Sequence, residues 1–382
     1  KRQAMDSMDY LKEARSNYDK GQYKVAIIQL KNSLQINPDN ARARLLLGKV
    51  YLKYQDGLTA EKELLRAQEL GLSREEVIPS LGRAWVMNGQ FDKLLQSLSI
   101  EAEDPLPLKT DILVLQGKAY FGLQSYSMAE EKFTGALEQQ PQNADAKVGM
   151  AQLAMKDADL EAAGQLVDSA IEADDRNEDA WVLKGDLLRI AGEHEEAVAA
   201  YQKALDVIPG GVAARLGSAM SFISLDQPDK ALPEVGDVLD RFPEYYPAQY
   251  IKALALYRQQ KPGPASDLLA EVFKRSPNHL PSHLLAGTIA YQQGSLNQAE
   301  RHLRSYWQLN PTNQQVAKLL AATLMKSGEP GKAIEVLAPE AASASEDAQY
   351  LALLGKAYLE TGEVDRGIEM LEKAAAVAPD IA

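Results

Sequence analysis

Four basic residues recur at nearly equal intervals and are the first candidates for chemistry in this chain. Arg15, Lys49, Arg83 and Lys118 are separated by 34, 34 and 35 residues. Residues that recur at a fixed interval occupy equivalent places in a repeated structure, so these side chains are expected to form a ladder on one surface. A basic ladder attracts an anionic ligand or peptide through its local field. The alternative is that these side chains pair with nearby acids across repeats.

A second group of candidates is aromatic or sulfur-containing and lies in the second half of the chain. It consists of Met220, Tyr250, Tyr257 and Tyr291. Exposed clusters of this kind mark binding surfaces, and here they suit an amphipathic protein segment or a sugar chain. Packing between repeats is the alternative role for these side chains.

The histidines do not match a metal or catalytic motif. His194 is not followed by the second histidine of a zinc-protease helix, and Pro281 separates His279 from His283. We expect Pro281 to lie in a loop, so these two histidines should not share a helix face. The chain also lacks a Gly-x-Ser-x-Gly elbow, a phosphate loop and a dinucleotide fingerprint. We therefore predict no catalytic residue, no metal and no cofactor.

The interval of 34 residues runs through the whole chain and is marked by small side chains. Counted from Ser7, the eighth residue of each repeat is never larger than alanine. These residues are Ala14, Gly48, Gly82, Gly117, Ala151, Gly185, Ala219, Ala253, Gly287, Ala321 and Gly355. The twentieth residue is alanine in nine repeats, with Leu94 and Gly367 as the exceptions. A fixed interval of this length resembles the tetratricopeptide (TPR) pattern.

Each repeat is expected to hold two antiparallel helices that approach closely where the small residues meet. Glycines such as Gly21 and Gly192 stand where first helices should end, and asparagines such as Asn40 and Asn177 stand where they should begin. We predict an all-α fold, a right-handed superhelical solenoid of about eleven helix-turn-helix repeats. The repeats begin near residues 7, 41, 75, 110, 144, 178, 212, 246, 280, 314 and 348. We expect one continuous solenoid over residues 1–382, as a fragment of a longer array.

In TPR arrays the concave surface is lined mainly by positions 2, 5, 9, 12 and 13 of the first helices. The basic ladder occupies position 9 of the first four repeats, and Lys53 and Lys156 at position 13 extend it. Three departures from the pattern are expected to disturb the stack. They are the third repeat around residues 75–109, the join at Ala341 to Glu346, and Pro233 inside a second helix.

Composition excludes several classes of protein. With 41 Lys and Arg against 54 Asp and Glu, the net charge is −13, which argues against general nucleic-acid binding. No apolar run approaches the ~18–20 residues of a membrane span. The chain has no cysteine and therefore no disulfide or thiolate metal site.

A more specific resemblance covers residues 23–72. Its most distinctive parts read LKNSLQINPDNARARLLLGK and AEKELLRAQELGL. This stretch resembles the opening of the TPR-repeat lipoproteins that accompany exosortase/PEP-CTERM sorting systems in Gram-negative bacteria. The resemblance implies a periplasmic protein, attached to the membrane only through a lipid anchor upstream of Lys1. It also implies a role in exopolysaccharide production and surface-protein sorting, and so in biofilm or floc formation. A cytoplasmic location is the alternative.

The sequence thus predicts a non-enzymatic scaffold that binds a protein partner or peptide segment, and possibly polysaccharide, in its concave groove. One alternative is a TPR module of another polysaccharide secretion machine. The other is the targeting arm of an enzyme whose catalytic domain lies outside this chain.

Overall fold

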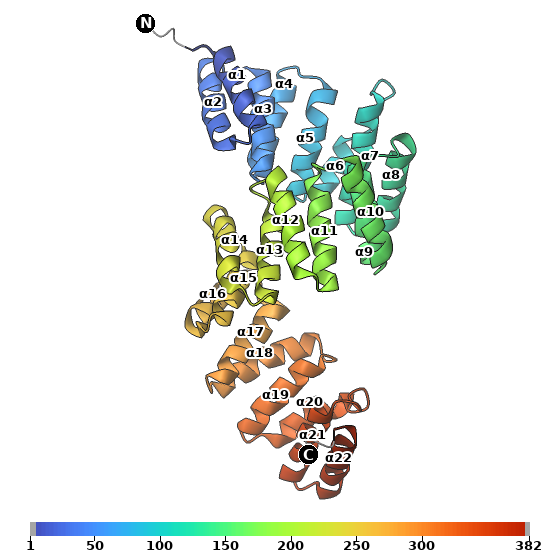
Figure 1. Cartoon of the computed structure of the whole chain (residues 1–382), viewed down its shortest axis with the longest axis vertical. Coiled ribbons are helices and arrows are strands. Elements are labelled where there is room, and N and C mark those ends of the chain that lie inside the picture. The colour runs from blue at the N-terminus through green and yellow to red at the C-terminus, as the bar shows by residue number, and fades with distance from the viewer. Residues whose placement is uncertain (1–4, 379–382) are drawn as a thin grey trace. The chain divides into compact units, whose positions relative to one another are not determined.

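The computed structural model describes residues 5–378, which form helices joined by short turns (Figure 1). In this range there are 22 α-helices, one 3-10 helix and no strand. The predicted all-α fold is therefore confirmed. Contacts within the chain divide it into two compact units: unit 1, residues 1–225, and unit 2, residues 226–382. That the eleven repeats form one continuous solenoid stays a prediction.

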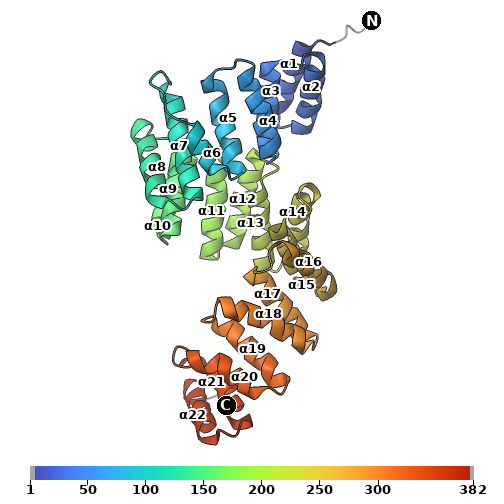
Figure 2. The same cartoon turned by 180° about the vertical axis from the view of Figure 1, so that it is seen from behind.

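Unit 1 holds six helix pairs and one further first helix (Figure 2). The first helices are α1 (Ser7–Asp19), α3 (Ala41–Lys53), α5 (Arg74–Met87), α7 (Leu106–Gly122), α9 (Ala144–Lys156), α11 (Glu178–Ala191) and α13 (Val212–Ser224). The second helices are α2 (Tyr23–Ile36), α4 (Gly57–Glu69), α6 (Phe91–Ser97), α8 (Tyr126–Gln139), α10 (Leu160–Ala173) and α12 (His194–Val207). Each first helix also contacts the first helix of the next repeat, so the first helices share one face.

Unit 2 begins with a second helix and continues with four helix pairs. Its helices are α14 (Pro228–Arg241), α15 (Tyr246–Arg258), α16 (Pro262–Arg275), α17 (Leu280–Gln292), α18 (Leu296–Leu309), α19 (Gln314–Lys326), α20 (Pro330–Leu337), η1 (Ala338–Glu340), α21 (Ala348–Glu360) and α22 (Val364–Val377). None of the helices described in either unit is long and apolar enough to cross a membrane.

The small residues at position 8 lie where the two helices of a repeat cross. All eleven are buried, as are the eleven residues at position 20. A β-carbon at Gly48 would lie 2.6 Å from Leu64 Cγ, and one at Gly287 would lie 2.6 Å from Leu303 Cγ. Leu64 and Leu303 both occupy position 24 of their repeats. A larger residue at position 8 would therefore push the second helix away.

The same contact also joins neighbouring repeats. Phe133, at position 24 of the fourth repeat, is fully buried. Its ring lies between Gly117 in its own repeat and Gly149 in the next, and a β-carbon at either glycine would overlap the ring. One aromatic side chain thus fixes both the helix pair and its successor.

The third repeat departs from the pattern, as predicted. Its second helix, α6, spans only Phe91–Ser97, and residues 98–105 form no helix. Helix α7 begins at Leu106, four residues before the predicted start at 110. The space at Gly82 is filled by Leu115 of the following repeat. The join at Ala341 to Glu346 is likewise non-helical, consisting of turns.

Turn and cap chemistry agree with the sequence. Asn40, Asn143, Asn177 and Asn313 each accept a hydrogen bond from a backbone N–H of the first turn, so the predicted N-caps are confirmed. Position 15 adopts a left-handed conformation in all eleven repeats, with φ between 56° and 85°. Six of these residues are glycines. The other five are Gln55, Gln124, Ala158, Asp226 and Gln260.

Prolines stand at the first residue of three second helices and also inside one of them. Pro228, Pro262 and Pro330 are the first residues of second helices, where a missing N–H costs nothing. Helix α14 continues through Pro233, where the sequence predicts a disturbance of the stack. Pro379, at position 32 of the eleventh repeat, lies outside the described residues.

Replacing Gly185 by Leu should overpack the sixth repeat, because a β-carbon there would lie 2.6 Å from the buried ring of Tyr201. We expect a loss of about 1–3 kcal/mol in the free energy of unfolding, measured by urea denaturation. Gly164→Leu is the control, because nothing lies within 4 Å of a β-carbon at Gly164. Equal stability of the two variants would contradict the assigned packing.

Replacing Ala158 by Gly should stabilise the protein, because its φ of 62° strains a residue that has a β-carbon. The free energy gained by relieving this strain exceeds the entropic cost of a more flexible glycine in the unfolded chain. We therefore expect the free energy of unfolding to rise by about 0.5–1 kcal/mol. In Ala154→Gly, inside helix α9, the same change should lower stability. Urea midpoints of both variants against the wild type check this, and a loss in Ala158→Gly would contradict it.

Candidate functional site

Ion pairs in unit 1 show that positions 2 and 9 of the first helices lie on one surface. We call the surface formed by positions 2, 5, 9, 12 and 13 the first-helix face. Arg83 of α5 pairs with Asp145 of α9 at 3.0 Å. Lys118 of α7 pairs with Asp179 of α11 at 2.8 Å and lies 3.8 Å from Asp145. In both of the shorter pairs a cation at position 9 reaches an acid at position 2, two repeats further along the chain.

Surrounding residues desolvate the charged groups of these pairs, although the Arg83 side chain still contacts solvent. Burial lowers the pKa of Lys118, yet Asp179 and Asp145 overcome this and raise it to about 12. Lys118 and Arg83 in turn lower the pKa of Asp145 to about 2. Arg83 is 63% exposed although surrounding protein desolvates it, as expected for a side chain on an inwardly curved, wetted surface. The alternative of pairing across repeats thus holds for this half of the predicted ladder.

The other half of the ladder has no such partners. Among residues 5–378, Arg15, Lys49 and Lys53 form no ion pair and no side-chain hydrogen bond. Lys49 and Lys53 are half-buried, while Arg15 is exposed. Burial lowers the pKa of Lys49, and Arg15 and Arg83 lower it further against the opposite effect of Glu76.

The position-2 residues account for part of this division, although Asp111 of repeat four also occupies this position and forms no ion pair with Lys49. In repeats five and six this position holds Asp145 and Asp179, which meet the cations above. In repeat two it holds Arg42, which gives Arg15 no acid. In repeat three it holds Glu76, whose carboxylate instead accepts hydrogen bonds from the backbone and hydroxyl of Ser73 in a capping box.

Unit 1 curves enough to bring its sixth repeat near its second. Lys53 of α3 interacts electrostatically with Arg176, Glu178 and Asp179, which lie at or just before the start of α11. Burial and Asp179 raise the pKa of Glu178 to about 7, against the effects of Lys53 and Lys118. Figure 1 shows α11 to α13 returning toward the region of α3 and α5.

Asp145, Asp179 and Arg176 were not among the site residues predicted from the sequence. Asp145 and Asp179 recur at position 2, so that position provided a signal as regular as the basic ladder. Arg176 lies in the loop before α11, outside positions 2, 5, 9, 12 and 13 of the first helices. Its place near Lys53 depends on the curvature of four successive repeats.

Lys156, the predicted extension of the ladder at position 13, is exposed and forms an ion pair with its neighbour in sequence. Its amine pairs with neighbouring Asp157 at 2.6 Å and lies 4.7 Å from the centre of the Tyr126 ring. Met220 is half-buried on α13 in unit 1, whereas the three predicted tyrosines belong to unit 2.

The tyrosines of unit 2 lie at the edge of its core. Tyr250 packs edge-on against His279 with ring centres 5.0 Å apart. The Tyr257 hydroxyl accepts a hydrogen bond from Gln292 at 2.7 Å. Tyr291 lies beneath the Lys326 amine at 4.9 Å. All three tyrosines pack against buried hydrophobic clusters, so they have a structural role.

The predicted loop around Pro281 is wrong. Pro281 lies in the first turn of α17, where its missing N–H is tolerated. The His283 side chain meets His302, with the two Nδ1 atoms 3.2 Å apart. Phe273 stacks on His302 at 5.1 Å. No group of three His, Cys, Asp or Glu residues that could hold a metal is found within residues 5–378.

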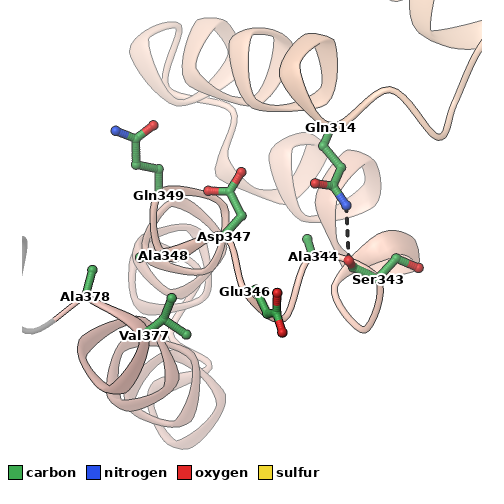
Figure 3. Close-up of a pocket in the computed structure, with 9 residues that line it drawn as sticks. All are labelled: Gln314, Ser343, Ala344, Glu346, Asp347, Ala348, Gln349, Val377 and Ala378. Carbon is green, nitrogen blue, oxygen red and sulfur yellow. Dashed lines mark hydrogen bonds between the residues drawn. The ribbon is translucent and has the colours of Figure 1, made fainter.

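An open polar pocket of about 530 Å³ lies beside the irregular join in unit 2 (Figure 3). Asp347 is already bound by Lys318 at 2.6 Å and by the backbone N–H of Tyr350 at 2.9 Å. Gln314 donates a hydrogen bond to the Ser343 carbonyl at 3.2 Å. Because these polar groups are occupied in holding the join, we assign the pocket a structural role.

Replacing Asp145 by Asn should destabilise unit 1, because Arg83 and Lys118 would lose a shared anion. We expect the free energy of unfolding to fall by about 1–3 kcal/mol at pH 7. Urea unfolding monitored by hydrogen exchange in α9 measures this change. Asp168→Asn, which breaks the exposed pair with Lys184, is the control and should cost about 0–1 kcal/mol.

The same variant tests how the contribution of Asp145 to stability depends on pH. The pKa of Asp145 in the folded protein is about 2, below its ordinary value of 3.8. Its contribution to stability is therefore complete above about pH 4 and is lost as the pH falls toward 2. The difference in urea midpoint between wild type and Asp145→Asn should narrow over this window. A difference that does not change with pH would contradict the pairing.

Family models of tetratricopeptide repeats match most of the chain. One matches residues 120–187 and 290–356, and others match 14–55, 216–265, and 178–210 with 348–381. No curated protein matches the chain.

Solved structures share the fold at low sequence identity. PilW, a type IV pilus biogenesis factor, is 18% identical with a TM-score of 0.51, over 55% of this chain and 98% of PilW. A human IFIT1 dimer with m7Gppp-AAAA is 17% identical with a TM-score of 0.50, over 88% of this chain and 90% of IFIT1. Together with the position-8 packing, the family models show that this chain belongs to the tetratricopeptide-repeat proteins, a class of interaction scaffolds.

Proposed function

We propose that this chain is a non-enzymatic scaffold whose first-helix face in unit 1 docks a segment of a partner protein. The observation that carries the proposal is the set of cations without ion-pair partners, Arg15, Lys49 and Lys53, held on rigid helices. Half-buried cations without counter-ions are uncommon in a surface that has only a structural role. A docked segment would supply the missing interactions.

We further propose that the scaffold works in the periplasm, lipid-anchored in the full-length protein. There it would support exopolysaccharide production and PEP-CTERM protein sorting, and thereby biofilm or floc formation. The support is the resemblance of residues 23–72 to the TPR lipoproteins of these systems. Direct polysaccharide binding by the tyrosines of unit 2 has less support, because those rings pack against the core.

Site-specific photo-crosslinking in the native host tests both proposals. A photoreactive amino acid at Arg42, on the first-helix face, should yield an adduct with one partner protein. The same residue at Lys31, exposed on the second helix α2, should not. We expect mass spectrometry to identify the partner as a component of exopolysaccharide synthesis or protein sorting.

Two outcomes would contradict these proposals. Equal adducts at Arg42 and Lys31 would show that the first-helix face is not the docking surface. A reproducible partner from another process, captured at Arg42 alone, would retain the scaffold and reject its proposed setting.

A further inference from the structure

Four cations on or beside the first-helix face of unit 1 lack ion-pair partners among residues 5–378. Arg15 lies on α1, Lys49 and Lys53 lie one turn apart on α3, and Arg176 lies in the loop before α11. They contrast with Arg83 and Lys118, which are neutralised by aspartates. The chain therefore keeps one part of its basic surface paired and leaves the adjoining part unpaired.

The unpaired cations belong to one electrostatic cluster. Arg15 and Arg83 both act on Lys49, and Arg83 and Arg176 both act on Lys53. Bringing like charges together in a half-buried place is unfavourable unless an anion is added. The cluster is therefore suited to a ligand that carries negative charge.

The acids near this cluster do not pair with it. Glu178 and Asp179 influence Lys53, but neither approaches its amine to within 4.0 Å. Asp179 is bound by Lys118. Glu76 influences Lys49, but its carboxylate belongs to the capping box of α5. Within residues 5–378, no carboxylate therefore forms an ion pair with either lysine.

Aromatic side chains adjoin the cations. The rings of Tyr18 and Tyr23 are 5.6 Å apart, and those of Tyr23 and Tyr54 are 6.3 Å apart. Arg176 acts electrostatically on both Tyr18 and Tyr23, which places the rings beside the basic cluster. A ligand bound here would contact several separate cations and an aromatic patch at the same time.

We infer that Lys49 and Lys53, with Arg15 and Arg176, bind an acidic segment of the partner protein whose apolar side chains pack on Tyr18 and Tyr23. The inference rests on the proposed function, because it names the chemistry of the segment that docks there. Cations from three separate parts of the chain suit several carboxylates along an extended peptide better than one compact anion. The scaffold's class favours a protein segment over an acidic polysaccharide.

Fluorescence anisotropy with a short labelled peptide rich in Glu and Leu tests the inference. We expect the full chain to bind this peptide and to bind its Gln-for-Glu counterpart at least about tenfold more weakly. In Lys49→Gln/Lys53→Gln, binding should weaken about tenfold and its salt dependence should decrease. Lys24→Gln/Lys31→Gln on α2 removes the same charge from exposed positions and should leave binding unchanged.

Three results would overturn the inference. They are equal affinity for the Glu and Gln peptides, equal weakening in both double variants, and binding of a polyuronate oligosaccharide without binding of the peptide. Far-ultraviolet circular dichroism of both variants controls for folding. A partner crosslinked at Arg42 with no acidic-peptide binding would refute the acidic segment and keep the scaffold. Acidic-peptide binding without any crosslinked partner would refute the scaffold function and keep the anion site.

Discussion

The structure depends on one contact, between a large side chain at position 24 and the small residues that face it. Phe133 lies between Gly117 in its own repeat and Gly149 in the next. Tyr201 contacts Gly185 and Gly217 in the same way. Because the ring touches two successive repeats, it fixes the angle between helices and also the step from repeat to repeat. The curvature of unit 1 follows from that step.

Curvature decides which charges meet on the first-helix face. Arg83 reaches Asp145, and Lys118 reaches Asp179, across 62 and 61 residues of sequence. Neither pair is possible within one repeat. The same curvature brings Arg176 near Lys53, where it adds positive charge. One packing rule therefore produces a paired half of the surface, which stabilises the stack, and an unpaired half, which is available to a ligand.

Much of the fold could be predicted because its determinants are local and repeated. Asparagine caps and glycines at position 15 act within a few residues of sequence, and the small residues at position 8 recur at a fixed interval. Gln55 and Ala158 are left-handed but are not glycine, so their residue types do not indicate this conformation and only their place at position 15 does. Pro281 was misplaced because a proline fits a loop and a first helical turn equally well. The basic ladder was visible, but its division depended on which acids curvature brings to it.

One surface of unit 1 holds lysines in opposite electrostatic states, and side-chain NMR titration measures this directly. Carbon-detected titration of the lysine side chains reports the pKa of each amine. We predict that the pKa values of Lys49 and Lys53 lie below the ordinary lysine value of 10.5, and that the pKa of Lys118 lies near 12. If all three lysines titrate together near 10.5, the division of the surface into paired and unpaired halves is contradicted.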